Sequence, residues 1–177
     1  MKRSISLLVC TLVLFACTQV LAQKSEEAAE RLKFNGVWLY DTKQSKVGKT
    51  LKDLYKDQTL TIIYSDPKLE IKKVQTKDGE TKSATVTVYT DRRGEVNNPF
   101  PFNEKERLAS VTEWKGRSLV RLSVGEIPYK GSKLKIYIRE VFSLSKDDKT
   151  LTVTEETFTD SPTIFFPEVF KKVYQRI

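Results

Sequence analysis

The chain ends in the stretch FKKVYQRI, in which Lys172, Tyr174 and Arg176 occupy every second position. In a β-strand, this spacing places the three side chains on one face. A cation beside a phenol hydroxyl can hold an acidic headgroup by charge-assisted hydrogen bonds, with Lys172 supplying the charge and Tyr174 a directional donor. The alternation also permits the reverse arrangement, in which these residues face solvent and Val173 and Ile177 face the core. Lys172 and Tyr174 are therefore candidate ligand-binding residues.

The sequence has two pairs of neighbouring acids, Glu155-Glu156 and Asp147-Asp148. Such pairs suggest either the catalytic carboxylates of a glycosidase or the ligands of a calcium site. Neighbours in a strand point to opposite faces, so Glu155 and Glu156 cannot form a facing catalytic pair by themselves. Asp147-Asp148 lies in a polar turn and lacks the spaced ligands of a calcium-binding loop. Both pairs are predicted to be solvated charges.

Histidine is absent from the sequence, and both cysteines, Cys10 and Cys17, lie near its start. Removal of a leader that contains them would leave a chain with neither residue type. This excludes Cys/His zinc sites, Ser-His-Asp and Cys-His catalysis, and histidine-ligated haem. We therefore predict a protein that is not an enzyme and has no catalytic residues, no metal and no cofactor.

Residues 1–22 are predicted to be a signal peptide. A short basic region precedes an almost wholly apolar run from Ile5 to Ala16, and Val20-Leu21-Ala22 has the small residues of a cleavage site. The apolar run is shorter than the ~20 residues that span a bilayer. We therefore predict export to the periplasm or the extracellular space. Leu14-Phe15-Ala16-Cys17 also resembles a bacterial lipobox, so a membrane-anchored lipoprotein attached through Cys17 is the alternative.

Cleavage after Ala22 would leave 155 residues (177 − 22), enough for one domain with a real core. The leader carries Lys2 and Arg3 and no acids, so the net charge falls from +8 to +6. Basic residues are spread along the chain with acids between them, which favours a solvated surface; attraction to an acidic ligand or an anionic envelope is the other interpretation. Stretches with alternating basic and aromatic residues, such as KLKIYIRE, suggest a nucleic-acid-binding function. Nucleic acid is mostly cytoplasmic, so an exported protein fits that function poorly, and we predict no nucleic-acid partner.

Residues 34–177 are predicted to form one all-β domain. β-Branched residues recur with partial alternation in short runs such as Thr59 to Tyr64 and Leu134 to Leu144. Asp78-Gly79 is a strong hairpin signal, and Gly125 to Ser132 is predicted to be a loop. No helical patterns alternate with the strands, which argues against a parallel sheet.

An antiparallel meander of this size must close or protect its edges. The sequence therefore predicts an up-and-down barrel of eight to ten strands. A polar segment, residues 23–33, precedes it and could form one short helix or a tether. Two proline-containing stretches carry four phenylalanines that either line or cover the open end of the barrel or cap its core: Phe100, Phe102, Phe165 and Phe166.

The first expected strand begins with Phe34-x-Gly36-x-Trp38, which resembles the opening motif of lipocalins and related calycin barrels. The resemblance implies that Trp38 plugs one end of the barrel and that Gly36 lets another segment approach closely. It also implies that an arginine of the last strand, here Arg176, packs over the indole. Gly36, Trp38 and Arg176 are thus predicted to close the barrel as structural residues.

Three later stretches, DPKLEI, TEWKGRSLV and LSKDDKTLTVT, together with Asp41 and Ser45 after the opening motif, resemble secreted bacterial lipocalin-like proteins of unassigned function. That resemblance implies a fold and no reaction. Lys172-x-Tyr174 also resembles the Arg-x-Tyr pair of intracellular fatty-acid-binding proteins, which points inward and holds a ligand carboxylate. Lysine in place of arginine loses the bidentate geometry of that contact.

Two functions follow from these observations. The first is a secreted, non-enzymatic barrel that binds a small hydrophobic or amphipathic molecule. The alternative is a structural or interaction protein of the cell envelope, whose barrel is filled with side chains and has no small-molecule ligand. A large interior cavity favours the first function, and a packed interior favours the second.

Overall fold

The structure is a computed structural model that describes residues 23, 25–48, 57–99, 101, 107–129, 132–161 and 169–177, without the side chains of residues 127–129 and 132. The leader, Cys17 and the four loop phenylalanines lie outside this part of the chain, so the predictions for them stay predictions. Across the described residues, one short helix, residues 25–32, precedes a single antiparallel sheet. None of the described helical segments has the length and apolar character to cross a membrane.

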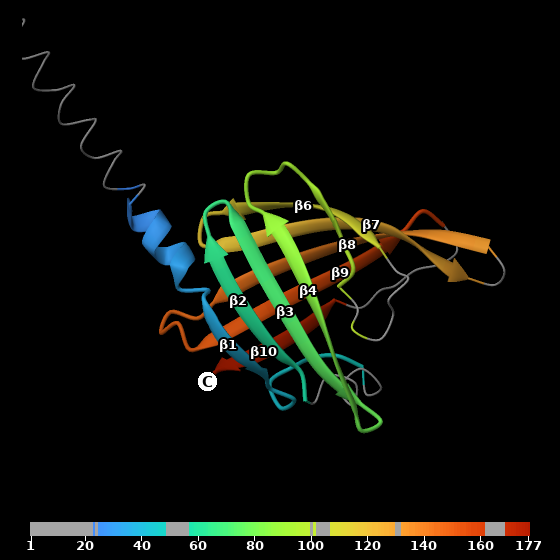
Figure 1. Ribbon diagram of the computed structural model, residues 1–177, viewed down its shortest axis with the longest axis horizontal. Helices are drawn as coiled ribbons and strands as arrows, with labels where there is room; N and C mark the ends of the chain where they lie inside the picture. Colours follow the sequence, from blue (N-terminus) through green and yellow to red (C-terminus); the bar gives the residue numbers. More distant parts are fainter. Residues whose placement is uncertain are drawn as a thin grey trace, which may run out of the picture.

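Ten strands form the sheet within the described residues. They are β1 (Gly36–Tyr40), β2 (Thr59–Ser65), β3 (Lys68–Lys77), β4 (Glu80–Tyr89), β5 (Glu95–Asn97), β6 (Leu108–Lys115), β7 (Ser118–Tyr129), β8 (Ser132–Leu144), β9 (Thr150–Thr159) and β10 (Phe170–Arg176). Each strand pairs with its neighbour in sequence, except that β1 also pairs with β10 and that no ladder joins β4 to β5. The sheet thereby curls into a barrel, with β2, β3 and β4 in front of β8 and β9 and the helix outside one end (Figure 1).

The barrel is closed between β4 and β5 by side chains rather than by a backbone ladder. The amide of Asn97 replaces a strand partner: its Nδ2 donates to the carbonyl of Thr87 (2.7 Å), and its Oδ1 accepts from the Thr87 N–H (3.0 Å). The Tyr89 N–H donates to Glu95 at 3.4 Å. The predicted up-and-down barrel of eight to ten strands is therefore confirmed, with one seam that lacks strand-to-strand pairing.

The turns follow the chemistry of their residues. Asp78 and Gly79 both have positive φ, 53° and 81°, as a two-residue hairpin turn of type I′ requires. After β1, Asp41 accepts hydrogen bonds from the backbone of Lys43 and Gln44 and so fixes the next turn. Ser45 then accepts from the Val173 N–H at 2.9 Å, which ties this turn to β10.

The predicted loop from Gly125 to Ser132 is wrong. β7 continues to Tyr129 and β8 begins at Ser132, and together they form a long hairpin that extends beyond the other strands at the right of Figure 1. Gly125 lies inside β7 because β6 approaches it closely: a Cβ atom there would be 2.4 Å from Leu108 Cδ2 and 2.9 Å from the Arg107 carbonyl oxygen. The glycine marks a close contact within a strand, not a turn.

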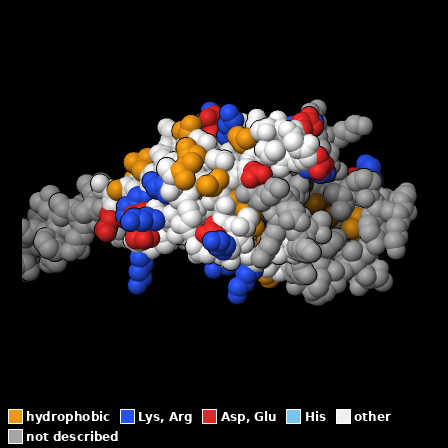
Figure 2. Space-filling view, turned by 90° about the horizontal axis from the view of Figure 1, so that it is seen from below, with side chains coloured by type: hydrophobic (Ala, Val, Ile, Leu, Met, Phe, Trp, Pro, Cys, Tyr) orange, Lys and Arg blue, Asp and Glu red, His pale blue; other side chains and the backbone are white. Residues whose placement is uncertain are grey.

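The core fills the barrel toward the end that Trp38 closes. Its buried side chains come from both walls: Phe34, Trp38, Tyr40, Leu60, Ile62, Tyr64, Leu69, Ile71, Val86, Val88, Leu119, Phe142, Leu151, Val153 and Tyr174. A second cluster of Leu108, Leu134 and Ile136 lies where the β7–β8 hairpin meets β6. Charges of both signs are interspersed on the face seen in Figure 2.

Candidate functional site: a charged cluster inside the barrel

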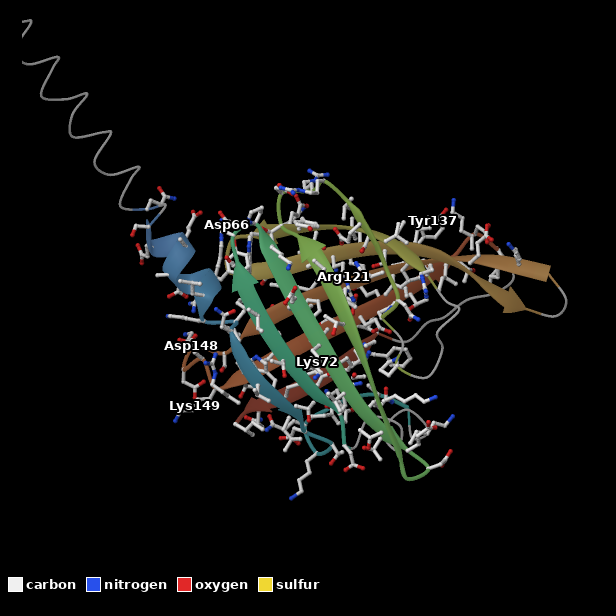
Figure 3. The ribbon with its side chains drawn as sticks, in the orientation of Figure 1. Asp66, Lys72, Arg121, Tyr137, Asp148 and Lys149 are labelled. Carbon is white, nitrogen blue, oxygen red and sulfur yellow. The ribbon has the colours of Figure 1, made fainter. Side chains whose placement is uncertain are left out.

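Four charged side chains form a row on the inner faces of consecutive strands. Arg121 of β7 is directly opposite Glu140 of β8, which is directly opposite Glu155 of β9. Lys172 of β10 lies one diagonal step further and completes the row. Figure 3 labels Arg121 in the middle of the barrel. Because each of these strands alternates with period two, the row faces inward together with the apolar core.

The row contains two ion pairs. Arg121 Nε donates to Glu140 Oε2 at 2.6 Å, and Lys172 Nζ donates to Glu155 Oε2 at 2.7 Å. Arg121, Glu140 and Lys172 are all buried. Glu140 and Glu155 are like charges at directly opposed positions, an arrangement that is destabilising unless cations flank it. Burial acts to raise the pKa of Glu155, but the charge and hydrogen bond of Lys172 outweigh it and lower that pKa below its ordinary value.

A fifth charge, Lys73 of β3, faces the same space from the opposite wall. It is in phase with the buried Leu69 and Ile71 and lines a small cavity together with Arg121, Glu140 and Lys172. Burial, and then the charge of Lys172, lower the pKa of Lys73 from 10.5 to about 8. Among the described residues no ion pair or hydrogen bond engages its ammonium group. The cluster therefore has three cations and two acids, a net charge of +1 while Lys73 is protonated.

Tyr174 and Gln58 add uncharged polar groups beside this cluster. The Tyr174 hydroxyl donates to Gln58 Oε1 at 2.5 Å, and its ring packs edge-on against Tyr40. Gln58 is buried, and its Nε2 has no acceptor among the described residues. A buried donor without a partner costs about 1–3 kcal/mol. An uncompensated cation thus lines the interior space, and an unused amide donor lies behind Tyr174, which lines the same space.

The space enclosed by these side chains is small. Its volume is about 20 Å³, enough for the centre of roughly one water molecule, which needs about 10–15 Å³. At this level of the barrel the interior is filled by side chains. A ligand headgroup could enter only if long side chains such as Lys73 move aside.

The predicted barrel-closing residues meet at one end of the barrel, where β1 pairs with the last residues of β10. Trp38 is fully buried, and its Nε1 donates to the Phe34 carbonyl at 3.1 Å. The Arg176 guanidinium lies over the indole, 4.4 Å from the ring centroid, and donates to the Lys33 carbonyl. Gly36 has φ +148°, which side chains rarely adopt, whereas a Cβ atom there would contact Arg176 at an ordinary 3.7 Å. Backbone conformation, more than lack of space, requires this glycine.

The structure separates the three residues that the sequence placed on one face. Lys172 and Tyr174 are buried in the barrel, whereas Arg176 lies at its end over Trp38. The arrangement in which Lys172 and Tyr174 face solvent is therefore wrong. Of the two core residues that it expected, Val173 is buried and Ile177 is exposed. Glu155 and Glu156 do point to opposite faces: Glu155 pairs with Lys172 inside, and Glu156 with Arg139 outside. The prediction that both are solvated charges is therefore wrong for Glu155.

Sequence reasoning missed Lys73, Arg121, Glu140 and Gln58. For the first three the signal was present as charged residues in phase with apolar ones, as in Leu69-x-Ile71-x-Lys73. No group of three or more metal-ligating side chains gathers anywhere in the part of the chain that the structure describes.

Comparison with known proteins supports the fold. No protein-family model matches the chain, and no curated protein matches its sequence. Among solved structures, it is similar to the apo form of lipid binding protein 8 of Caenorhabditis elegans, with a TM-score of 0.50 and 10% identity over 82% of this chain and 96% of that one. The chain therefore shares the antiparallel, up-and-down barrel fold of that protein. At this identity the likeness extends to the fold alone.

Proposed function

We propose that the barrel binds a small amphipathic molecule with an acidic headgroup, without catalysing a reaction. The observation that carries this proposal is the uncompensated cation in the barrel: among the described residues, Lys73, Arg121 and Lys172 face two acids, Glu140 and Glu155. A carboxylate or similar anion would neutralise the extra charge, and such charge-assisted hydrogen bonds are about twice as strong as neutral ones.

The roles of the cluster residues follow from their partners. Lys73 would supply the charge that no acid of the described residues pairs with, and Lys172 would contribute its charge beside its ion pair with Glu155. Gln58 would orient the headgroup through its Nε2 donor, and the Tyr174 hydroxyl, which donates to Gln58 Oε1, would hold that amide in place. The neighbouring apolar side chains, among them Leu60, Val86 and Phe142, would contact the hydrocarbon part. The lipid-binding name of the similar nematode structure is consistent with this class of ligand.

Titration with dodecanoate and with dodecan-1-ol, which has the same chain length but no charge, tests the proposal. Lys73→Met and Lys172→Met should each weaken dodecanoate binding by about 1.5–3 kcal/mol, the range for hydrogen bonds to charged groups. Binding of dodecan-1-ol should hardly change. Lys72→Met is the matched control, because Lys72 is the exposed neighbour of Lys73 on the outer side of β3 (Figure 3). Equal losses for both ligands would assign the lysines to packing instead.

The small cavity favours the alternative function. An interior of about 20 Å³ beside two internal ion pairs suits a structural or interaction protein of the envelope with a filled barrel. Native mass spectrometry of protein purified from its own host separates the two proposals. Bound acidic amphiphile would support the first, and a ligand-free mass together with no binding of dodecanoate or dodecan-1-ol would support the second.

We also propose that the protein is exported, with residues 1–22 removed, and belongs with secreted bacterial lipocalin-like proteins. The basic, apolar and small-residue pattern of the leader supports this. Intact-mass measurement of the mature protein should give a chain that begins at Gln23. A chain that begins at an acylated Cys17 would instead support the lipoprotein alternative.

A further inference from the structure

A second pocket lies outside the barrel, between the helix of residues 25–32 and the end that Trp38 closes. Its volume is about 340 Å³, and none of its lining residues belongs to the charged cluster inside the barrel. Phe34, Trp114 and Leu144 form its apolar wall, and the helix supplies Glu27 and Arg31. This volume lies within the range of small-molecule sites, roughly 300–1,000 Å³.

The indole of Trp114 gives the pocket a rigid, flat surface. The rings of Phe34 and Tyr64 pack edge-on against it, with centroids 5.1 Å and 5.5 Å away. The guanidinium of Arg31 lies over the indole at 5.6 Å from its centroid. Aromatic rings and guanidinium groups both stack on planar molecules, so the geometry suits a flat aromatic ligand.

The charges around the pocket largely compensate one another. Glu27 pairs with Arg31 at 3.2 Å. Glu30 pairs with Lys33 and with Arg117, and both of these cations also lie near Asp148. Asp148 is labelled beside the helix end in Figure 3. Glu26 also lines the pocket, so four acids face three bases and the net charge of the rim is −1 (3 − 4). An anionic ligand is therefore disfavoured.

Two buried N–H groups in the pocket wall lack acceptors. Trp114 Nε1 and Arg31 Nε have no hydrogen-bond partner among the described residues, although both side chains line the pocket. Buried donors are nearly always satisfied in folded proteins, by protein, water or ligand. The Arg31 side chain lies across the indole and is held by an i, i+4 ion pair with Glu27, a kind of contact that contributes little. Rotation of Arg31 would present both donors to an incoming acceptor.

We propose that this pocket binds an uncharged planar aromatic molecule that carries a carbonyl oxygen. The aromatic part would stack on Trp114, and the carbonyl would accept from Trp114 Nε1 and Arg31 Nε. A cationic ligand would leave both donors unused and would meet the Arg31 charge. A carboxylate would meet Glu27 and Glu30.

Four naphthalene probes of one shape test the proposal by calorimetric titration: 2-naphthamide, 2-naphthoate, 2-naphthylmethylamine and naphthalene. We expect 2-naphthamide to bind most tightly. Trp114→Phe keeps an aromatic ring but removes one donor, and it should weaken 2-naphthamide binding about five- to tenfold, the effect of one neutral hydrogen bond. Naphthalene affinity should change less than twofold. Lys72→Met, on the exposed outer side of β3 and away from the pocket, is the control and should leave both affinities unchanged.

A measurement on the unaltered chain does not depend on the folding of a variant. In a ¹H–¹⁵N spectrum, 2-naphthamide should shift the indole N–H resonance of Trp114 and leave that of Trp38 in place, because Trp38 already donates to the Phe34 carbonyl. Equal affinities of 2-naphthamide and naphthalene, an unshifted Trp114 resonance, or a loss of binding in Lys72→Met would each overturn the proposal.

Discussion

The two partners of the Lys172–Glu155 ion pair should contribute unequally to stability, because the surrounding charges are unequal. Glu155→Gln would leave three cations, Lys73, Arg121 and Lys172, against the single acid Glu140. Lys172→Met would leave two cations and two acids. The first change creates a net interior charge of +2, and the second a net charge of zero.

The expected magnitudes follow from burial. Lys172 retains 8% of its side-chain exposure and Glu155 19%, so the pair is largely withdrawn from water. Removing one partner of such a pair costs about 3–5 kcal/mol when the remaining charge is uncompensated. We expect that range for Glu155→Gln. Lys172→Met should cost only about 1–3 kcal/mol, since Arg121 and Lys73 still compensate the carboxylate of Glu155.

Urea unfolding at neutral pH measures the free energy of unfolding of Glu155→Gln, of Lys172→Met and of the double variant. Together with the unaltered protein, these form a double-mutant cycle. The double variant should be more stable than Glu155→Gln alone, because Lys172 is no longer buried without a partner. The pKa of Glu155 lies below its ordinary value of 4.5, so its contribution is present above that pH and disappears as the pH falls through the folded-state pKa. Equal losses for the two single variants, or an additive double variant, would refute the charge count given for the cluster.

Three further predictions concern the barrel. Trp38→Ala should lower the free energy of unfolding by about 3–5 kcal/mol, as large buried aromatics do, and a loss below about 1 kcal/mol in urea unfolding would contradict its closing role. Gly125→Ala should cost about 1–3 kcal/mol by overpacking against Leu108, whereas Gly79→Ala, with open space around its Cβ position, provides a comparison that measures φ strain alone. Raising the pH from 8 to 9.5 should stabilise the protein, because Lys73 keeps its proton in the unfolded state (pKa 10.5) but loses it at about pH 8 in the folded state. In thermal unfolding, Lys73→Met should gain less stability over this pH range. The same gain in the variant and the unaltered protein would contradict the lowered pKa of Lys73.

The fold was predictable because its signals are local. Asp78-Gly79 defines a hairpin by its φ requirements alone, and alternation in β2 and β3 identifies their inner faces. Gly125 misled the prediction because glycine occurs both in loops and where strands approach closely. Only the packing of Leu108, which is 17 residues away in sequence (125 − 108), distinguishes the two.

The candidate site was predictable only in part, for a similar reason. Lys172 and Tyr174 could be identified from one strand and a family resemblance. Their partners come from elsewhere in the chain, Glu155 from β9 and Gln58 from the residue before β2. The register between strands decides which side chains meet. Lys73 faces Lys172 across the barrel, so its charge could be recognised as uncompensated only once both walls were placed.

The pH dependence of dodecanoate binding tests the central claim most directly. Dodecanoate stays ionised above pH 7, while Lys73 loses its proton at about pH 8 in the free protein. Anion binding favours the protonated lysine, so the affinity for dodecanoate should be constant up to about pH 8 and then fall, by at most about tenfold per pH unit. Dodecan-1-ol affinity should not fall, and Lys73→Met should remove the pH dependence for dodecanoate. An affinity for dodecanoate that is the same from pH 7 to pH 9.5, or a fall that persists in Lys73→Met, would contradict the claim that Lys73 holds an acidic headgroup.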